Sequence, residues 1–261
     1  MMKSVRFLRS VIPFAKSDFR KRYAGTRLGV TWAYIQILSM VIVYWLVFQY
    51  GLKTSMVQNV PFLPWFISGY MPWMLFSECI MTCMGCMMEY NYIVKKVMFN
   101  VDIIPASKIA VSCFVHSFFL IVVLFVASLH GYQPNFYWLQ LIYYVIALLA
   151  LAIPLGYLMC TVSVFFKDFG QIVSIILNIM MWATPILWDY HVVITDKVAF
   201  ILKIINPMFY IICGFRESIL FSIGLVDHLK QGIYFWFVVL ILWKVCFSVY
   251  RRLLPQIADV M

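Results

Sequence analysis

Charge is scarce in this chain. Of its 261 residues, 11% are Asp, Glu, Lys or Arg, whereas ordinary soluble proteins contain about 25%. Hydrophobic residues reach 65% and acidic residues number 10. So little polar surface excludes a soluble globular fold, a disordered chain and a small disulfide-stapled domain. The motifs GxxxxGK[ST], HExxH, GxSxG and GxGxxG are also missing. We therefore expect no catalytic residue, no metal and no cofactor in this chain, and any ATP-driven work would come from a partner.

What the chain has instead is a series of long charge-free runs. One membrane-spanning helix needs about 20 apolar residues. The turn formers Gly131 and Pro134 divide the longest run in two. The sequence thus predicts an all-α integral membrane protein. Its six transmembrane helices are expected at residues 28–50, 62–87, 108–129, 136–165, 169–188 and 231–250.

An even number of spans places both chain ends on one side of the membrane. With the N-terminus in the cytoplasm, 14 of the 20 Lys and Arg residues fall on inner segments. The positive-inside rule therefore predicts an N-in, C-in topology, and the net charge of +10 suits anionic lipid heads better than nucleic acid. We expect a single domain over 1–261. Its parts are an interfacial segment (1–27), helices one to five (28–188), an outer segment (189–230), the sixth helix (231–250) and a cytoplasmic tail (251–261).

The first segment is amphipathic. Apolar residues recur from Val5 to Phe19 at the spacing of one helical face, and Lys and Arg lie opposite. Such a helix lies in the membrane interface. Pro13 removes one hydrogen bond in its middle, so the alternatives are one helix and two short helices, the second starting at Pro13.

Residues 189–230 mix acids and bases with a charge-free piece that is too short to cross a membrane. Asn206 and Pro207 interrupt this piece near its start, and Arg216 follows it. Irregular backbone at membrane depth survives only where protein or water covers it. We predict re-entrant helices on the outer side, near the mouth of a pathway. The alternative is a solvated loop with one surface helix.

Few ionisable or metal-binding side chains lie within the predicted spans. Cys79, Cys83 and Cys86 share a helical face, but a fourth zinc ligand is missing, so we interpret them as packing residues. Glu78 must face protein or water. His116 is either a functional group or a neutral side chain hydrogen-bonded to a neighbouring helix.

Two predicted helices carry distinctive stripes. In 169–188 a polar stripe faces either another helix or a conduit; it consists of Gln171, Ser174, Asn178, Trp182 and Pro185. In 28–50 the stripe is aromatic, with Tyr34, Tyr44, Trp45 and Phe48. Aromatic faces with polar edges suit sugar rings. Core packing and lipid contact are the alternative explanations for the second stripe.

Five segments are more informative together than any of them is alone. They are RYAGTRLGVTWAYIQ (22–36), NYIVKKVMF (91–99), VFFKDFGQIV (164–173), ATPILWD (183–189) and INPMFYIICGFRESIL (205–220). In this order and spacing the set resembles the membrane subunit of bacterial polysaccharide ABC exporters, which move O-antigen, teichoic acid and capsule chains. Asn100 and Lys167 depart from the family pattern, in which Pro and Arg are usual.

The resemblance implies a homodimer in the bacterial cytoplasmic membrane with two separate ATP-binding-cassette ATPase subunits, which would bind ATP and Mg. The substrate would be a glycan on a lipid carrier. O-antigen is the expected glycan, and teichoic acid, capsule, and drug or lipid efflux are the alternatives. A membrane-embedded transferase would need converging acids or His, for which Glu78 and His116 are the candidates. A secondary transporter would often show internal repeats, and none is convincing.

Roles for individual residues follow from the stripes and the resemblance together. Candidates for lining a channel between two copies are Trp32, Tyr34, Tyr44, Trp45, Phe48, Gln171, Asn178, Trp182 and Trp188. Candidates for receiving a lipid diphosphate are Arg20, Lys21, Arg22 and Arg27, unless these serve topology alone. Candidates for docking to the ATPase are Glu89, Asn91, Lys95 and Phe99.

Overall fold

The computed structural model describes residues 2–23, 27–53, 56–94 and 100–260, which form a bundle of helices with one small hairpin. The longer helices are α1 (Met2–Tyr23), α2 (Thr31–Leu46), α3 (Phe62–Cys83), α6 (Ile103–Leu129), α7 (Gln140–Phe165), α8 (Phe169–Ala183), α10 (Asp196–Ile205), α11 (Pro207–Arg216) and α12 (Leu229–Val260). The shorter helices are α4 (Cys86–Glu89), α5 (Asn91–Val94) and α9 (Tyr190–Val193), with single turns at Val47–Gly51, Phe136–Leu139, Glu217–Phe221 and Leu225–His228. Strands β1 (Met56–Val57) and β2 (Val60–Pro61) pair antiparallel.

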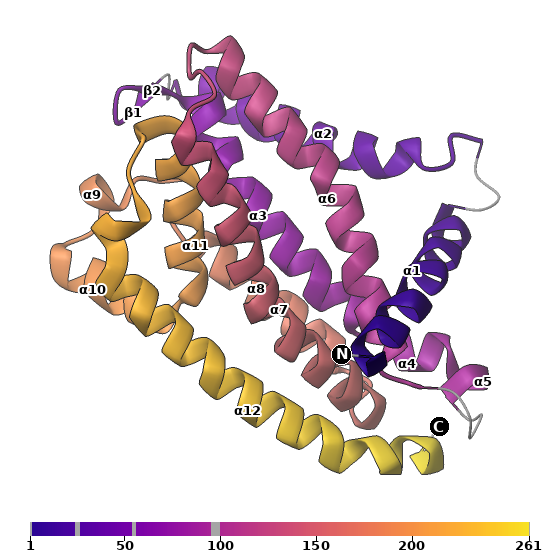
Figure 1. Ribbon diagram of the computed structural model, residues 1–261. Coiled ribbons are helices and arrows are strands. Elements are labelled where there is room, and N and C mark those ends of the chain that lie inside the picture. Colours follow the sequence, from indigo (N-terminus) through magenta and orange to yellow (C-terminus); the bar gives the residue numbers. More distant parts are fainter. Residues whose placement is uncertain (1, 24–26, 54–55, 95–99, 261) are drawn as a thin grey trace.

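Helix α3 is the centre of the bundle (Figure 1). Most of its side chains are buried, because α6, α7 and α11 pack around it. Helix α12 runs along α7, and α1 crosses α6. Both chain ends lie at the end of the bundle that holds α4 and α5, whereas the hairpin, α9 and α10 lie at the opposite end (Figure 1).

The prediction of an all-α, multi-pass membrane protein is confirmed. Within the described ranges, four segments are long and apolar enough to cross a membrane, namely Thr31–Gly51, Ile103–Leu129, Phe136–Phe165 and Leu225–Ile257. The bent pair α10 and α11 adds a fifth if it counts as one span. The remaining two predicted helices are present as α3 and α8, with 22 and 15 residues.

Several predicted helix ends were wrong, for local reasons. α3 stops at Cys83 because Met84 is extended and Gly85 takes a φ of +73°. α8 stops at Ala183 because Pro185 disfavours the helical conformation of Thr184, the residue before it, which is extended. α12 extends far beyond 250, because charges on a helix that emerges from the apolar layer do not end it.

The N-terminal segment is one helix, with Pro13 inside it, rather than two. Its buried face contains Val11, Ala15 and Asp18, while Ile12 of the expected apolar face is 67% exposed. Aromatic contacts fix the helix against the bundle, with the Phe19 and Phe114 rings 5.3 Å apart. Helix α1 is therefore docked on α6 through part of its surface.

The segment 189–230 contains two helices at a sharp angle. α10 and α11 are bent by 108° at Asn206, whose side-chain oxygen caps α11 by accepting from the backbone N–H of Met208 at 3.0 Å. Pro207 opens α11, where its missing N–H costs nothing. α11 is buried against α3 and α7, which a solvated loop with one surface helix does not explain.

Candidate functional sites

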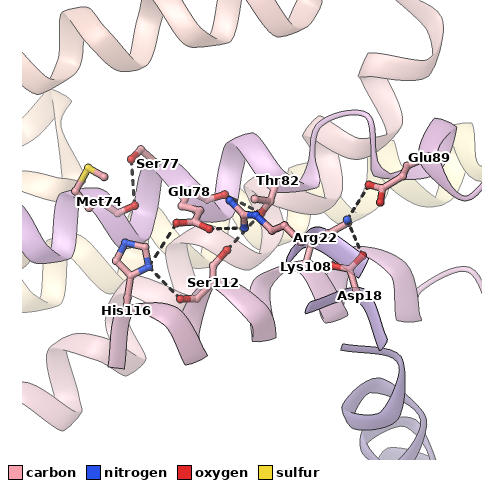
Figure 2. A network of polar contacts seen from close by, with 10 residues as sticks. All are labelled: Asp18, Arg22, Met74, Ser77, Glu78, Thr82, Glu89, Lys108, Ser112 and His116. Atoms are coloured by element: carbon pink, nitrogen blue, oxygen red, sulfur yellow. Dashed lines mark hydrogen bonds and ion pairs between the residues drawn. The ribbon is translucent and has the colours of Figure 1, made fainter. Parts of the chain in front are cut away.

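Ionisable side chains from four helices meet at the end of the bundle near α4 (Figure 2). We call this group the polar cluster; it consists of Asp18 and Arg22 of α1, Glu78 of α3, Glu89 of α4, and Lys108 and His116 of α6. It joins the N-terminal helix to the centre of the bundle and to the short helix α4.

Lys108 is the bridge of the polar cluster. Its Nζ lies 2.8 Å from Asp18 Oδ1 and 2.7 Å from Glu89 Oε2. The Tyr90 hydroxyl also donates to Asp18. Burial and the Asp18 carboxylate raise the pKa of Tyr90, so its hydroxyl remains a donor. The Asp18 side chain is only 4% exposed, and a buried carboxylate of this kind needs both a cation and a hydrogen-bond donor.

Glu78 forms the second half of the polar cluster. Its carboxylate accepts from Arg22 Nη1 at 2.8 Å, and its other oxygen lies 3.6 Å from His116 Nδ1. His116 Nδ1 is also 3.0 Å from the carbonyl of Ser112 on its own helix. Glu78 was predicted to face protein or water, and it contacts side chains of α1 and α6 and lines a cleft. The structure brings Glu78 and His116 together, as the transferase alternative requires. However, Glu78 is the one carboxylate of this pair, and Arg22 neutralises its charge.

Two clefts adjoin the polar cluster. One, of about 370 Å³, is lined by polar side chains that include Lys21, Arg22 and Lys108. The other, of about 330 Å³, lies toward α2 and contains Glu78 and Gln36. Both are lined by Arg22. The first cleft therefore combines three cations with the carboxylates of Asp18 and Glu89.

The predicted basic group divides into two kinds of residue. All four residues, Arg20, Lys21, Arg22 and Arg27, are exposed. Arg22 is engaged with Glu78, and the Lys21 ammonium lies 5.3 Å from the centre of the Tyr90 ring. Two of these four cations, Lys21 and Arg22, thus already contact other side chains of the chain.

The aromatic stripe of α2 is partly packed within the chain. Tyr34 contacts Phe118 of α6 with ring centres 4.2 Å apart, and Tyr44 lies 5.4 Å from Phe66 of α3. Phe48 stacks on Phe62 at 4.9 Å, and Trp45 meets Tyr50 at 5.7 Å. Trp32 is exposed. Internal packing, one of the alternatives weighed for this stripe, accounts for Tyr34, Tyr44 and Phe48. The contact of Trp45 is with the exposed Tyr50 of its own helical segment, so it is not explained in this way.

The polar stripe of α8 faces the other way. Val173, Leu177 and Met181 are buried against the bundle, so the opposite side of the helix points outward. That side holds the exposed Ile175 and Ile179, and the polar stripe lies on its flank. Gln171, Asn178 and Trp182 of the stripe are exposed, whereas Ser174 is half-buried and Pro185 is buried. Trp188 follows the helix and donates from Nε1 to the Trp182 carbonyl at 2.8 Å. A single copy of the chain thus leaves these polar groups uncovered.

A buried arginine organises the opposite end of the bundle. Arg216 is 5% exposed and lies at the end of α11. It donates to the backbone carbonyls of Trp65, Pro185 and Ile186 at 3.0 to 3.4 Å. Its guanidinium lies 3.7 Å from the centre of the Trp65 ring, a favourable cation–π position. Nearby, Asn206 Nδ2 donates to Thr184 Oγ1 at 2.6 Å. We call this group the Arg216 joint.

The predicted ATPase-docking residues are only partly visible. Glu89 is held by Lys108, and Asn91 is exposed at the start of α5. Lys95 and Phe99 lie outside the described residues. Among the residues that are described, all seven cysteines are free, and no group of three or more His, Cys, Asp or Glu is placed to hold a metal ion.

Sequence reasoning missed two members of the polar cluster, Asp18 and Lys108. Asp18 had a signal, since it is the one acid among the eight basic residues of segment 1–27. Lys108 had a weaker signal at the start of a charge-free run. Nothing in the sequence indicates that the two residues pair, because they are 90 positions apart.

Comparison with known proteins gives consistent results. The family model described as ABC-2 type transporter matches residues 13–220. The O-antigen export system permease protein RfbA of Myxococcus xanthus is 26% identical over 211 residues, covering 79% of this chain and 78% of that protein. A protein of the same name from Klebsiella pneumoniae is 23% identical over 252 residues, covering 96% of this chain and 94% of that protein.

Proposed function

Because the chain belongs to the ABC-2 type transporter family, we propose that it is the permease subunit of an ATP-driven exporter that moves lipid-linked polysaccharide across the bacterial cytoplasmic membrane. The observation that carries this proposal is the outward polar and aromatic stripe on α8 in an otherwise apolar surface. The names of the RfbA relatives favour O-antigen over teichoic acid, capsule or drug efflux as the cargo.

The proposal includes six spans with both chain ends in the cytoplasm. Helices α2, α3, α6, α7, α8 and α12 follow the predicted order and support it, as does the position of both ends near α4 and α5 (Figure 1). The bend between α10 and α11 supports re-entrant helices on the outer side. Reporter fusions placed at the C-terminus and in the loop at 131–135 test this topology. They are expected to report opposite sides of the membrane, and the same side for both would overturn it.

We propose further that two copies enclose the channel. Gln171, Asn178 and Trp182 would meet the glycan together with exposed surfaces of α2, including Trp32. Many weak stacking contacts suit a moving polymer because they tolerate sequence and register, as aromatic tracks do for single-stranded nucleic acids. Tyr44 and Phe48 would support this wall from behind, since both pack on α3.

Two ATPase subunits would bind ATP and Mg, since this chain has no phosphate-cradling motif. They would dock on the segment with Glu89, Asn91, Lys95 and Phe99. Lys108 would then carry movement of this segment to α1, because it binds Glu89 and Asp18 together. Arg20, Lys21 and Arg27 would receive the lipid diphosphate next to the cleft that Lys21 lines.

The deciding experiment is reconstitution of the chain with its ATPase subunit in lipid vesicles. Added lipid-linked glycan is expected to increase ATP turnover, and the chain alone is expected to hydrolyse none. ATP turnover that ignores the glycan would overturn the assignment of substrate. ATP hydrolysis by the chain alone would overturn its role as a permease.

A paired variant tests the channel wall. Trp45→Ala with Trp182→Ala is expected to lower polymer export, while ATPase assembly stays intact. A matched control is Trp243→Ala, because Trp243 lies on α12 and donates to the Ala150 carbonyl at 2.6 Å, away from both stripes. Unchanged surface glycan in the paired variant would remove the aromatic track from the mechanism.

A further inference from the structure

An apolar cavity of about 300 Å³ lies between α10, α11 and the start of α12. Its walls are aromatic and aliphatic, with Phe200, Ile204 and Phe235 among them. Two lysines, Lys203 and Lys230, also line it, and no acidic side chain does. The cavity therefore combines an apolar interior with two positive charges.

Neither lysine has a carboxylate partner among the described residues. Lys203 Nζ lies 4.9 Å from the centre of the Tyr190 ring and 5.6 Å from that of Phe209. Aromatic rings orient an ammonium but leave its charge in place. The nearby carboxylate of Glu217 is occupied by His228 at 2.8 Å. The cavity therefore offers two ammonium groups to an anion, one half-buried at Lys203 and one exposed at Lys230.

The surroundings of the cavity are strongly apolar. Phe200 and Ile205 of α10 and Ile233 and Phe237 of α12 are each more than 60% exposed. In a multi-pass membrane protein such side chains face lipid, and a soluble protein would rarely leave so many uncovered. Lysines in this setting place their stems along apolar surface and their charges at the level of the head groups.

We propose that this cavity binds one anionic phospholipid. An acyl chain would occupy the apolar interior, and the phosphate would lie against Lys203 and Lys230. The apolar lining of the cavity favours a lipid over free phosphate, because inorganic phosphate gains nothing from contact with Phe200, Ile204 or Phe235. This site is separate from the polar stripe of α8 and from the polar cluster, so it goes beyond the transport proposal.

The test is native mass spectrometry of the full chain, purified in detergent and stripped of lipid, with added phosphatidylglycerol. Lys203→Gln with Lys230→Gln is expected to weaken binding about tenfold or more, because each lysine near an anionic head group contributes favourably. The matched control is Lys167→Gln with Lys197→Gln, which removes the same charge from exposed positions outside the cavity and is expected to bind as wild type does.

Further arms make the result decisive. Ile204→Trp fills the cavity and leaves both lysines, so it is expected to abolish lipid binding. Lys203→Arg with Lys230→Arg keeps both positive charges and is expected to retain most of the wild-type binding. Equal binding by all variants would overturn the proposal. Equal binding of phosphatidylethanolamine would reduce the site to an apolar groove, and displacement of the lipid by inorganic phosphate would assign it to the free anion; either outcome overturns a phospholipid site.

Discussion

Arg216 and Arg22 lie toward opposite ends of the bundle and are satisfied in opposite ways. Arg216 is buried, and it binds three backbone carbonyls and the face of Trp65. Arg22 is partly exposed, and the carboxylate of Glu78 is its partner at 2.8 Å. Carbonyls of a folded backbone cannot move independently, whereas an exposed ion pair breaks and re-forms readily. The comparison indicates a fixed joint around Arg216 and an adjustable one around Arg22.

The largest effect is expected from breaking the Arg216 joint. Arg216→Ala removes three hydrogen bonds to buried carbonyls, of which only that of Trp65 keeps a second side-chain donor among the described residues, the Ser68 hydroxyl; we expect a cost of roughly 3–5 kcal/mol in unfolding free energy. Thermal unfolding of the purified protein in detergent measures this loss. The stability of Arg216→Lys is expected to lie between that of wild type and that of Arg216→Ala. An Arg216→Ala protein as stable as wild type would mean that the carbonyls are not held by this side chain.

The next largest effect is expected at Lys108, which pairs with the buried carboxylate of Asp18 in the polar cluster. Its side chain is 11% exposed, and Lys108→Met leaves the Asp18 carboxylate without a cation. We expect a loss of about 2–4 kcal/mol. Adding Asp18→Asn removes the uncompensated charge and is expected to recover part of the loss. If the double variant is less stable than Lys108→Met alone, the ion pair does not explain the effect.

A substitution at Gly69 disturbs the Arg216 joint without removing a charge. A Cβ at Gly69 would lie 2.5 Å from Arg216 Nη2 and 3.2 Å from Ile212 Cγ2. Gly69→Ala therefore forces the guanidinium away from its carbonyls, with an expected loss of about 1–3 kcal/mol.

The matched control is Gly170→Ala, because the nearest atom to a Cβ there is Met84 Sδ at an ordinary 3.8 Å. Unfolding midpoints of the two variants should differ clearly. Equal midpoints would show that the Arg216 joint tolerates displacement and is not fixed.

The smallest effect on stability is expected at Arg22. Arg22→Gln should cost about 0–1 kcal/mol, because the pair is partly exposed. Export should nevertheless decrease, since α1 loses its link to α3. The exchange Arg22→Glu with Glu78→Arg is expected to restore export, measured as surface glycan. A large loss of stability in Arg22→Gln would make this joint as fixed as the other.

The sequence predicted the helices better than their ends. Runs without charge located the helices that became α2, α6 and α7, and a run with the single charge Lys244 located α12, because a charge is costly in hydrocarbon. The same criterion misplaced the start of α6, where Lys108 lies within the helix, and the end of α12, which contains Arg251. A charge ends an apolar run without ending a helix.

The candidate sites were predicted less completely than the fold. Periodicity placed Gln171, Asn178 and Trp182 on one face of α8, and the structure has that face outward. It also placed Tyr44 and Phe48 together, but helical spacing does not tell which way a shared face points. Their packing on α3 depends on how α2 is rotated about its axis, which only the neighbouring helices decide.

Composition alone made this chain a polytopic membrane protein, because a polypeptide with this little charge has nowhere else to bury its apolar surface. The tertiary structure decided which polar groups meet. Lys108 finds Asp18 across 90 residues, Arg22 finds Glu78 across 56, and Arg216 finds the Trp65 carbonyl across 151. Such partners are selected by the packing of whole helices, since one buried charge is stable only where another element brings it a partner.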